Sequence, residues 1–191
     1  MEDKILERRK KLLATLIFLI KLNLLVIPIY VLLYLDFSVP QIQFFLASSI
    51  SSTLSLFKFP VISEEKNVYV FLAESESYKI IPFEISMDCT GWKSMYLLFA
   101  LVFASSFDLK RNFKFLAIYL PILFIINFLR ITSTIAIALT LGFEYFEVTH
   151  NILWREGMIF FVILIWFIWL RKIKYKLKDN LNLVERLVRT F

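Results

Sequence analysis

Few residues of this chain could do chemistry, and the first is Cys89, the only cysteine among 191 residues. It stands in the stretch MDCTGWKSMY (87–96), directly before a long apolar run. A lone thiol cannot form an internal disulfide, and no CxxC motif or Cys/His cluster accompanies it. We therefore expect either an apolar filler side chain or a reactive thiol, with no metal and no cofactor.

The surroundings of Cys89 favour the reactive thiol. The sequence predicts a helix that begins at Cys89, with Lys93 one turn further along the same face. A helix N-terminus and a nearby ammonium group both favour the thiolate, which is the nucleophilic form of cysteine. Gly91 leaves room for a backbone or a substrate to approach closely. Taken alone, a single cysteine in a membrane helix is most often a small hydrophobic residue.

Two further residues are unusual in so apolar a chain: Arg130, inside an apolar segment, and His150, the only histidine. A guanidinium in a membrane span costs about 3 kcal/mol on insertion scales, so it should face the protein interior and a partner. Asn127, Arg130 and Thr134 are spaced i, i+3 and i+7, which predicts one polar helix face and a buried polar site. The plainer alternatives are a capping histidine and an arginine that pairs with an acidic residue of the following loop.

The elements that must position these residues are membrane helices. Hydrophobic residues make up 59% of the chain, the mean hydropathy is +0.72, and there are 21 Phe against 3 Gly. This apolar content far exceeds that of soluble domains. The length allows roughly four to six spans of about 20 residues each. We therefore expect an all-α integral membrane helix bundle, with residues 1–191 forming a single membrane domain.

The distribution of charge orients the chain. Fifteen of the 22 Lys and Arg residues lie in three patches next to apolar segments. Such patches mark the cytoplasmic ends of spans, and they argue against a nucleic-acid partner. The patches are the N-terminus (1–11), the loop holding Lys110, Arg111 and Lys114, and the tail (171–191). With all three inside, the chain is predicted to be a multi-pass cell-membrane protein with both termini in the cytoplasm.

Four full spans satisfy this rule, and they are predicted at 12–35, 92–107, 115–129 and 151–170. Segment 41–57 is short and carries five serines, and a further crossing there would move the middle basic patch outside. We interpret it as a re-entrant or interfacial segment. Segment 60–88 is then an extracytoplasmic acidic loop, in which two alternating runs predict a small β-hairpin that turns near Glu74 to Ser77.

Helix lengths place the three unusual residues at a similar depth. Cys89 and His150 each lie 21 residues from the basic residue at the inner end of their segment, or about 31 Å at 1.5 Å per residue. Arg130 lies 16 residues from Lys114, or about 24 Å, and its long side chain can extend further. The hydrocarbon core is about 30 Å thick. The three side chains are therefore predicted to meet near the extracytoplasmic face.

Three sequence elements, CTGWKS (89–94), NFLRI (127–131) and HNILWREG (150–157), resemble the signatures of the exosortase/archaeosortase family. In that family a Cys-[Ser/Thr/Ala]-Gly element, an Asn-x-x-Arg element and a downstream His occur in this order on membrane helices. The similarity covers roughly residues 82–170. It implies a membrane cysteine transpeptidase or protease, sortase-like in mechanism. Its substrates carry a C-terminal signal made of a short motif, a transmembrane helix and a basic cluster.

The resemblance also implies a role for each residue: Cys89 as the nucleophile, Arg130 as the group that stabilises the oxyanion, and His150 as the general acid/base. The chemistry agrees with this division, because a thiolate that attacks a peptide carbonyl forms a thioester and leaves negative charge on oxygen. The imidazole can then protonate the leaving amine. The implied acceptor of the new C-terminus is a lipid, a glycan or water.

Two other functions stay open at this point. A non-enzymatic membrane assembly or transporter subunit would use Arg130 and Lys21 as structural charges, with Cys89 incidental. A pore or proton path lined by Lys21, Asn127, Arg130 and His150 would instead show conductance or pH-dependent transport. Four spans from one copy leave little room for such a lumen.

Overall fold

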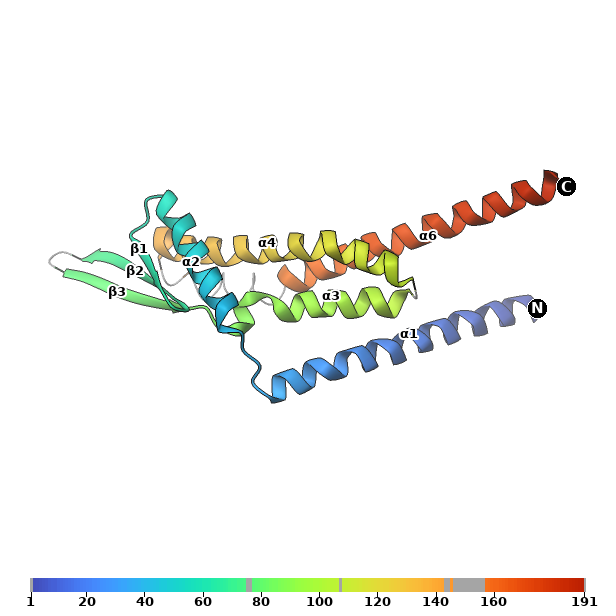
Figure 1. The fold of residues 1–191 in the computed structure, drawn as a ribbon, viewed down its shortest axis with the longest axis horizontal. Coiled ribbons are helices and arrows are strands. Elements are labelled where there is room, and N and C mark those ends of the chain that lie inside the picture. The colour runs from blue at the N-terminus through green and yellow to red at the C-terminus, as the bar shows by residue number, and fades with distance from the viewer. Residues whose placement is uncertain (1, 75–76, 107, 143–144, 146–156, 191) are drawn as a thin grey trace.

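The computed structural model describes residues 2–74, 77–106, 108–142, 145 and 157–190 (Figure 1). Its helices are α1 (Glu2–Tyr34), α2 (Pro40–Leu56), α3 (Trp92–Ser105), α4 (Leu109–Leu141) and α6 (Met158–Thr190), with a short 3₁₀ turn, η1 (Met87–Thr90). The strands are β1 (Val61–Glu64), β2 (Asn67–Glu74) and β3 (Ser77–Glu84). Figure 1 shows both termini at one end of the molecule and the sheet at the other.

Helices α3, α4 and α6 form the central bundle. Their buried core includes Leu98, Leu123, Val162 and Trp169, each at most 1% exposed. Helix α4 begins after Asp108, whose carboxylate accepts a hydrogen bond from the Arg111 backbone N–H at 3.2 Å and so caps an otherwise unpaired donor. From there α4 continues without a break for 33 residues. The helix thus extends from the terminal end of the bundle toward the sheet (Figure 1).

Helix α1 packs against the bundle along one side only. The Tyr96 hydroxyl of α3 donates to the Leu25 carbonyl at 2.8 Å, and Phe18 stacks on Trp166 with ring centroids 5.9 Å apart. The remaining surface of α1 is apolar and exposed: its membrane-type segment, Leu12–Tyr34, is not buried inside the protein. An exposed apolar face of this length is typical of a helix that contacts lipid.

The predicted count of four full spans is matched only in part. Among the described residues, two helices are long and apolar enough to cross a membrane: Leu12–Tyr34 and Leu109–Leu141. Helix α3 has 14 residues, or about 21 Å, against the 16 predicted. The first residues of the predicted span 151–170 lie outside the described part of the chain. Within the described part, α6 begins at Met158. The four-span topology therefore stays a prediction.

Helix α2 lies across the end of the bundle rather than along it (Figure 1). One of its faces is buried, with Leu46, Ile50 and Leu54 at most 1% exposed, in a cluster that also contains residues of α4 and the sheet. The Gln43 amide donates to the Ile85 carbonyl at 2.9 Å, which ties α2 to the chain just before η1. The assignment of 41–57 as a re-entrant or interfacial segment stays a prediction.

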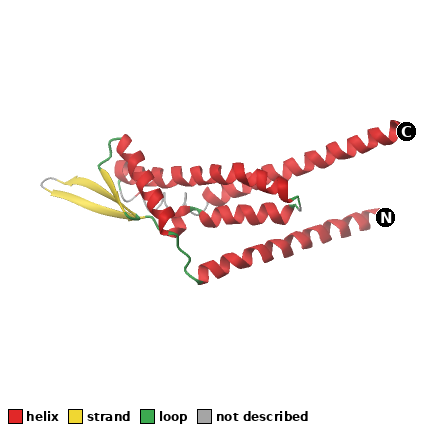
Figure 2. Ribbon diagram, viewed as in Figure 1, coloured by secondary structure: helices red, strands yellow, loops and turns green. Residues whose placement is uncertain are grey.

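The small sheet differs from the predicted hairpin, because segment 60–88 forms three strands and not two (Figure 2). The predicted hairpin is confirmed: β2 and β3 pair antiparallel from Asn67↔Glu84 to Glu74↔Ser77, which puts the turn where the sequence indicated. Strand β1 was missed. It has only four residues and pairs with β2 after Glu65, whose φ of 50° reverses the chain.

Candidate active site

Cys89 lies in the 3₁₀ turn η1, and not at the first residue of an α-helix as predicted. Helix α3 begins at Trp92, and the chain changes direction at Gly91, whose φ of 78° and ψ of 7° are left-handed. The continuous helix assumed between Lys110 and Cys89 is therefore wrong. The thiol is positioned by a turn packed against other elements, and not by the rise of its own helix.

Asn127 of α4 holds this turn in place. Its Nδ2 donates to the Cys89 carbonyl oxygen at 2.9 Å, and the Asn127 side chain is 1% exposed. A Cβ atom at Gly91 would lie 2.8 Å from Cγ of Asn127, closer than real Cβ atoms approach. Glycine is thus required at 91 for two reasons, the left-handed backbone and the contact with the amide.

Gly91→Ala should destabilise the protein by about 2–3 kcal/mol, since a left-handed alanine is strained and its methyl group displaces the Asn127 amide from Cys89. Unfolding in detergent, followed by circular dichroism, measures the loss. Gly142→Ala is the matched control: Gly142 also has positive φ, 105°, but its new methyl group would meet nothing within 4 Å. Alkylation of Cys89 should therefore change in the first variant only. Equal alkylation rates in both would contradict the proposed contact.

Arg130 is brought to Cys89, as the sequence predicted. Its Nη2 donates to the Cys89 carbonyl oxygen at 3.4 Å, and the guanidinium is close enough for its charge to interact with the thiol group. The predicted polar stripe is present, because α4 is continuous through this region. Asn127 and Thr134 are buried on it, and the Thr134 hydroxyl donates to the Arg130 carbonyl at 2.8 Å.

Ser86 is a site residue that sequence reasoning missed. Its hydroxyl donates to the Cys89 sulfur at 3.2 Å, from the position just before η1. In a 3₁₀ turn, side chains at i and i+3 are eclipsed, so the serine lies next to the thiol. A helix assumed to begin at Cys89 leaves Ser86 outside it. If MDCT had been predicted to form a separate turn, Ser86 would have been placed beside the thiol.

Lys93 takes a different partner from the one expected. Its ammonium group lies 2.7 Å from a carboxylate oxygen of Asp88, and both side chains are exposed. The lysine was expected to place its charge beside the thiol. The nearest donor that the described structure gives to the sulfur is the neutral hydroxyl of Ser86, and the fixed positive charge comes from Arg130 on α4.

The third predicted residue, His150, lies outside the described residues. The structure thus shows two of the three predicted side chains together. Within the described ranges, no three His, Cys, Asp or Glu side chains gather in a way that could hold a metal ion.

An apolar cavity lies next to Arg130, between α4 and α6. It has a volume of about 280 Å³. Helix α4 contributes Leu129 and Arg130 to its lining, and the start of α6 contributes Met158 and Phe161. The apolar lining of the cavity lies beside the Arg130 guanidinium, which also contacts the cysteine turn. A molecule with an apolar group in the cavity would therefore have its adjoining polar group next to Arg130.

Comparison with known proteins identifies the family of the chain. No curated protein and no solved structure matches the chain. The family model of the transmembrane exosortases matches residues 8–170, which include the turn with Cys89, the polar face of α4 with Arg130, and most of helix α1. The match covers well over half of the sequence, and the chain therefore belongs to the transmembrane exosortase family and is a membrane protein.

Proposed function

We propose that this protein is a membrane cysteine transpeptidase or protease that cleaves the C-terminal sorting signal of membrane-tethered proteins. The observation that carries the proposal is the contact between Arg130 and Cys89, two residues 41 positions apart that come from different elements. A thiol and a guanidinium in one partly buried site are the groups that acyl transfer through a thioester needs. Family membership supports the same class of reaction.

The reaction proceeds in two steps. In the first, the Cys89 sulfur attacks the carbonyl carbon of the scissile peptide, the C–N bond breaks, and a thioester forms on Cys89. His150 takes the proton of the Cys89 thiol and gives it to the leaving amine. In the second, the hydroxyl or amine of a lipid or glycan, or water, attacks the thioester carbon. The acceptor gives its proton to His150, the bond between sulfur and the acyl carbon breaks, and Cys89 leaves as the thiolate while the new C-terminus stays bonded to the acceptor.

Arg130 stabilises the oxygen that becomes negative in each step. Its guanidinium is a planar fork with several N–H donors, and the contact to the Cys89 carbonyl uses one of them. This contact places the guanidinium beside the backbone of the cysteine turn before the substrate arrives. Charge stabilisation of this kind is strong in a site that excludes water. The apolar cavity beside Arg130 supports the substrate on the same side.

The arrangement of the elements supports an orientation in the membrane. Both termini lie at one end of the bundle, and η1, α2 and the sheet lie at the other (Figure 1). We propose that the terminal end, with its basic N-terminus (1–11) and tail (171–191), is cytoplasmic. Cys89 then works at the extracytoplasmic face. Substrates would lie alongside the bundle through their own transmembrane helix, with the basic cluster at the terminal end.

Ser86→Ala should slow the reaction of Cys89 with iodoacetamide at neutral pH about fivefold, because the hydroxyl that stabilises negative charge on sulfur is lost. The rate is measured by mass spectrometry of the alkylated protein. Ser94→Ala, in the first turn of α3, is the matched control and should react like the wild type. If both alanine variants react at the wild-type rate, the serine does not assist the thiol.

The proposed function is tested by co-expression with proteins from the same genome that end in a shared short motif, an apolar helix and basic residues. An epitope tag after the basic residues should be lost when the enzyme is present. Hydroxylamine, which cleaves thioesters, should release the processed substrate from Cys89. If the folded enzyme leaves every such tag in place and forms no hydroxylamine-sensitive adduct, the proposal is wrong.

A further inference from the structure

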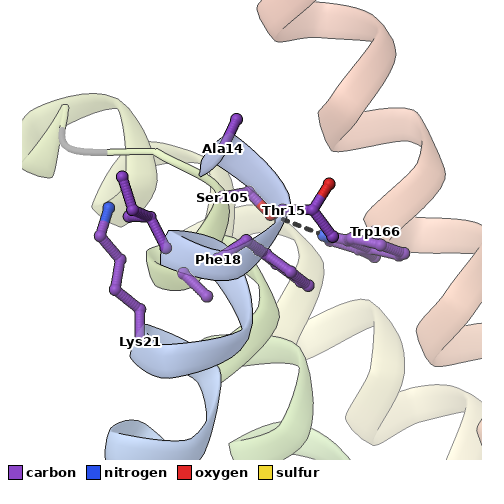
Figure 3. Close-up of a pocket in the computed structure, with 8 residues that line it drawn as sticks. Ala14, Thr15, Phe18, Lys21, Ser105 and Trp166 are labelled. Atoms are coloured by element: carbon purple, nitrogen blue, oxygen red, sulfur yellow. Dashed lines mark hydrogen bonds between the residues drawn. The ribbon is translucent and has the colours of Figure 1, made fainter. Parts of the chain in front are cut away.

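A second cavity lies at the opposite end of the bundle from Cys89, and the transpeptidase mechanism does not use it. It has a volume of about 500 Å³ and is bounded by α1, α3 and α6 (Figure 3). This volume is within the range of small-molecule binding sites. Its walls are mainly apolar, with Phe18, Ala104 and Trp166 among them, and Lys21 provides the positive charge.

The aromatic side of the cavity is rigidly built. The Trp166 indole N–H donates to the Ser105 hydroxyl at 2.9 Å, and that hydroxyl donates to the Leu101 carbonyl at 2.6 Å. Phe18 of α1 stacks on the same indole. Figure 3 shows Phe18 pointing toward Trp166, so these rings form one wall where α1 meets α6. The wall offers hydrocarbon and aromatic surface rather than polar groups.

Lys21 gives the opposite side of the cavity its charge. It lies nine residues into the apolar segment that begins at Leu12, about 13 Å along the helix axis. Its side chain extends away from Trp166 and back toward the N-terminal end of α1 (Figure 3). A lysine in a span commonly extends toward the nearer polar boundary in this way. The ammonium group therefore lies closer to that boundary than the Lys21 backbone does, beside an apolar groove.

The groove opens to the bilayer, because α1 is exposed along its length. Ile17, which lines the groove, is 42% exposed, and Ala14 at its rim is exposed as well. A ligand can thus enter the groove laterally from the bilayer. The ligand that combines a hydrocarbon chain for the groove with a negative charge for Lys21 is an anionic phospholipid. Arg8 and Arg9, further toward the N-terminus on the same helix, add positive potential that attracts such headgroups.

We propose that this groove binds one anionic phospholipid, with an acyl chain against the wall that Phe18 and Trp166 form together and the headgroup phosphate at Lys21. The lipid would fill the space between α1 and the rest of the bundle and so fix the position of α1. This role is independent of the proposed cysteine chemistry. It requires only that the chain sits in a bilayer, as its family membership establishes.

Trp166 makes the proposal testable, because bromine atoms on an acyl chain quench tryptophan fluorescence on contact. The protein is reconstituted in phosphatidylcholine, and brominated phosphatidylglycerol is compared with brominated phosphatidylcholine at equal mole fraction. The anionic lipid should bind with roughly fivefold preference, the value expected for one lysine near a membrane surface. Trp166→Phe should remove the lipid-selective part of the quenching, which assigns the signal to this groove.

Lys21→Met should lower the preference by roughly fivefold, the part that one lysine contributes. Lys114→Met removes an exposed charge from the first turns of α4, outside the groove, and should leave the preference intact. Ala14→Phe fills the mouth of the groove without a change of charge and should reduce quenching by both lipids. This variant tests the proposal even if Lys21→Met does not fold. Equal quenching by the two lipids in the wild type would overturn the proposal. So would exclusion of both, which a second copy seated on the groove would cause.

Discussion

Replacing Cys89 with serine is expected to stop substrate processing, with kcat/KM lower by roughly 10⁴-fold or more. The described contact to the side chain of residue 89 comes from the Ser86 hydroxyl, whereas the Asn127 amide and the Arg130 guanidinium donate to the backbone carbonyl oxygen. A serine hydroxyl keeps its proton at neutral pH and is a much weaker nucleophile than a thiolate, and a hydrogen-bond donor such as Ser86 does not activate it. Loss of the C-terminal tag from a co-expressed substrate measures the effect.

The control for this prediction separates the position of the thiol from its presence. Cys89 is the only cysteine, so Cys89→Ser combined with Ser94→Cys keeps one thiol in the chain and moves it into the first turn of α3. This double variant should be alkylated by iodoacetamide and yet process nothing. Wild-type processing by Cys89→Ser would show that the thiol is incidental, and a non-enzymatic assembly or transporter subunit would become the better interpretation.

The helices and the polar face that carries Arg130 were accessible from the sequence because they depend on local patterns. Apolar runs of the right length predict spans, and polar residues at i, i+3 and i+7 predict one helix face. Helix α4 satisfies both conditions: it is continuous from Leu109 to Leu141, and its polar face is buried. Arg130 therefore came to the expected place. The strand pair β2 and β3 was found for the same reason, since alternation is a local signal.

The parts that sequence reasoning missed depend on contacts between distant segments. The Asn127 amide reaches the Cys89 carbonyl across 38 residues, and only this contact explains why the turn at Gly91 is so tight. No periodic pattern in the sequence indicates the contact between Asn127 and Cys89. Because the helix was predicted to start at Cys89, neither the turn η1 nor the donor Ser86 was predicted. Strand β1 was hidden because its four residues are too few to establish an alternating pattern.

Arg130→Lys is the second substitution with a large expected effect, a loss of roughly 10² in kcat. Lysine keeps the positive charge but carries it on a single ammonium group, without the planar fork. One ammonium cannot both hold the Cys89 carbonyl, as Nη2 of Arg130 does at 3.4 Å, and reach the oxygen that becomes negative on the substrate. KM should change little, because the lost interaction belongs to the transition state and not to substrate binding.

Arg111→Lys is the matched control, because it makes the same change on the same helix, 19 residues from Arg130 and about 28 Å away along the axis. Arg111 contacts the Lys172 carbonyl and the Trp169 ring at the terminal end of the bundle, so its variant can lose stability but should keep kcat. Alkylation of Cys89 at the wild-type rate shows that each variant is folded at the site. If Arg130→Lys is folded by this criterion and retains full kcat, the guanidinium does not stabilise the oxyanion. Arg130 would then hold the cysteine turn through its contact with the Cys89 carbonyl, which makes it a positioning residue.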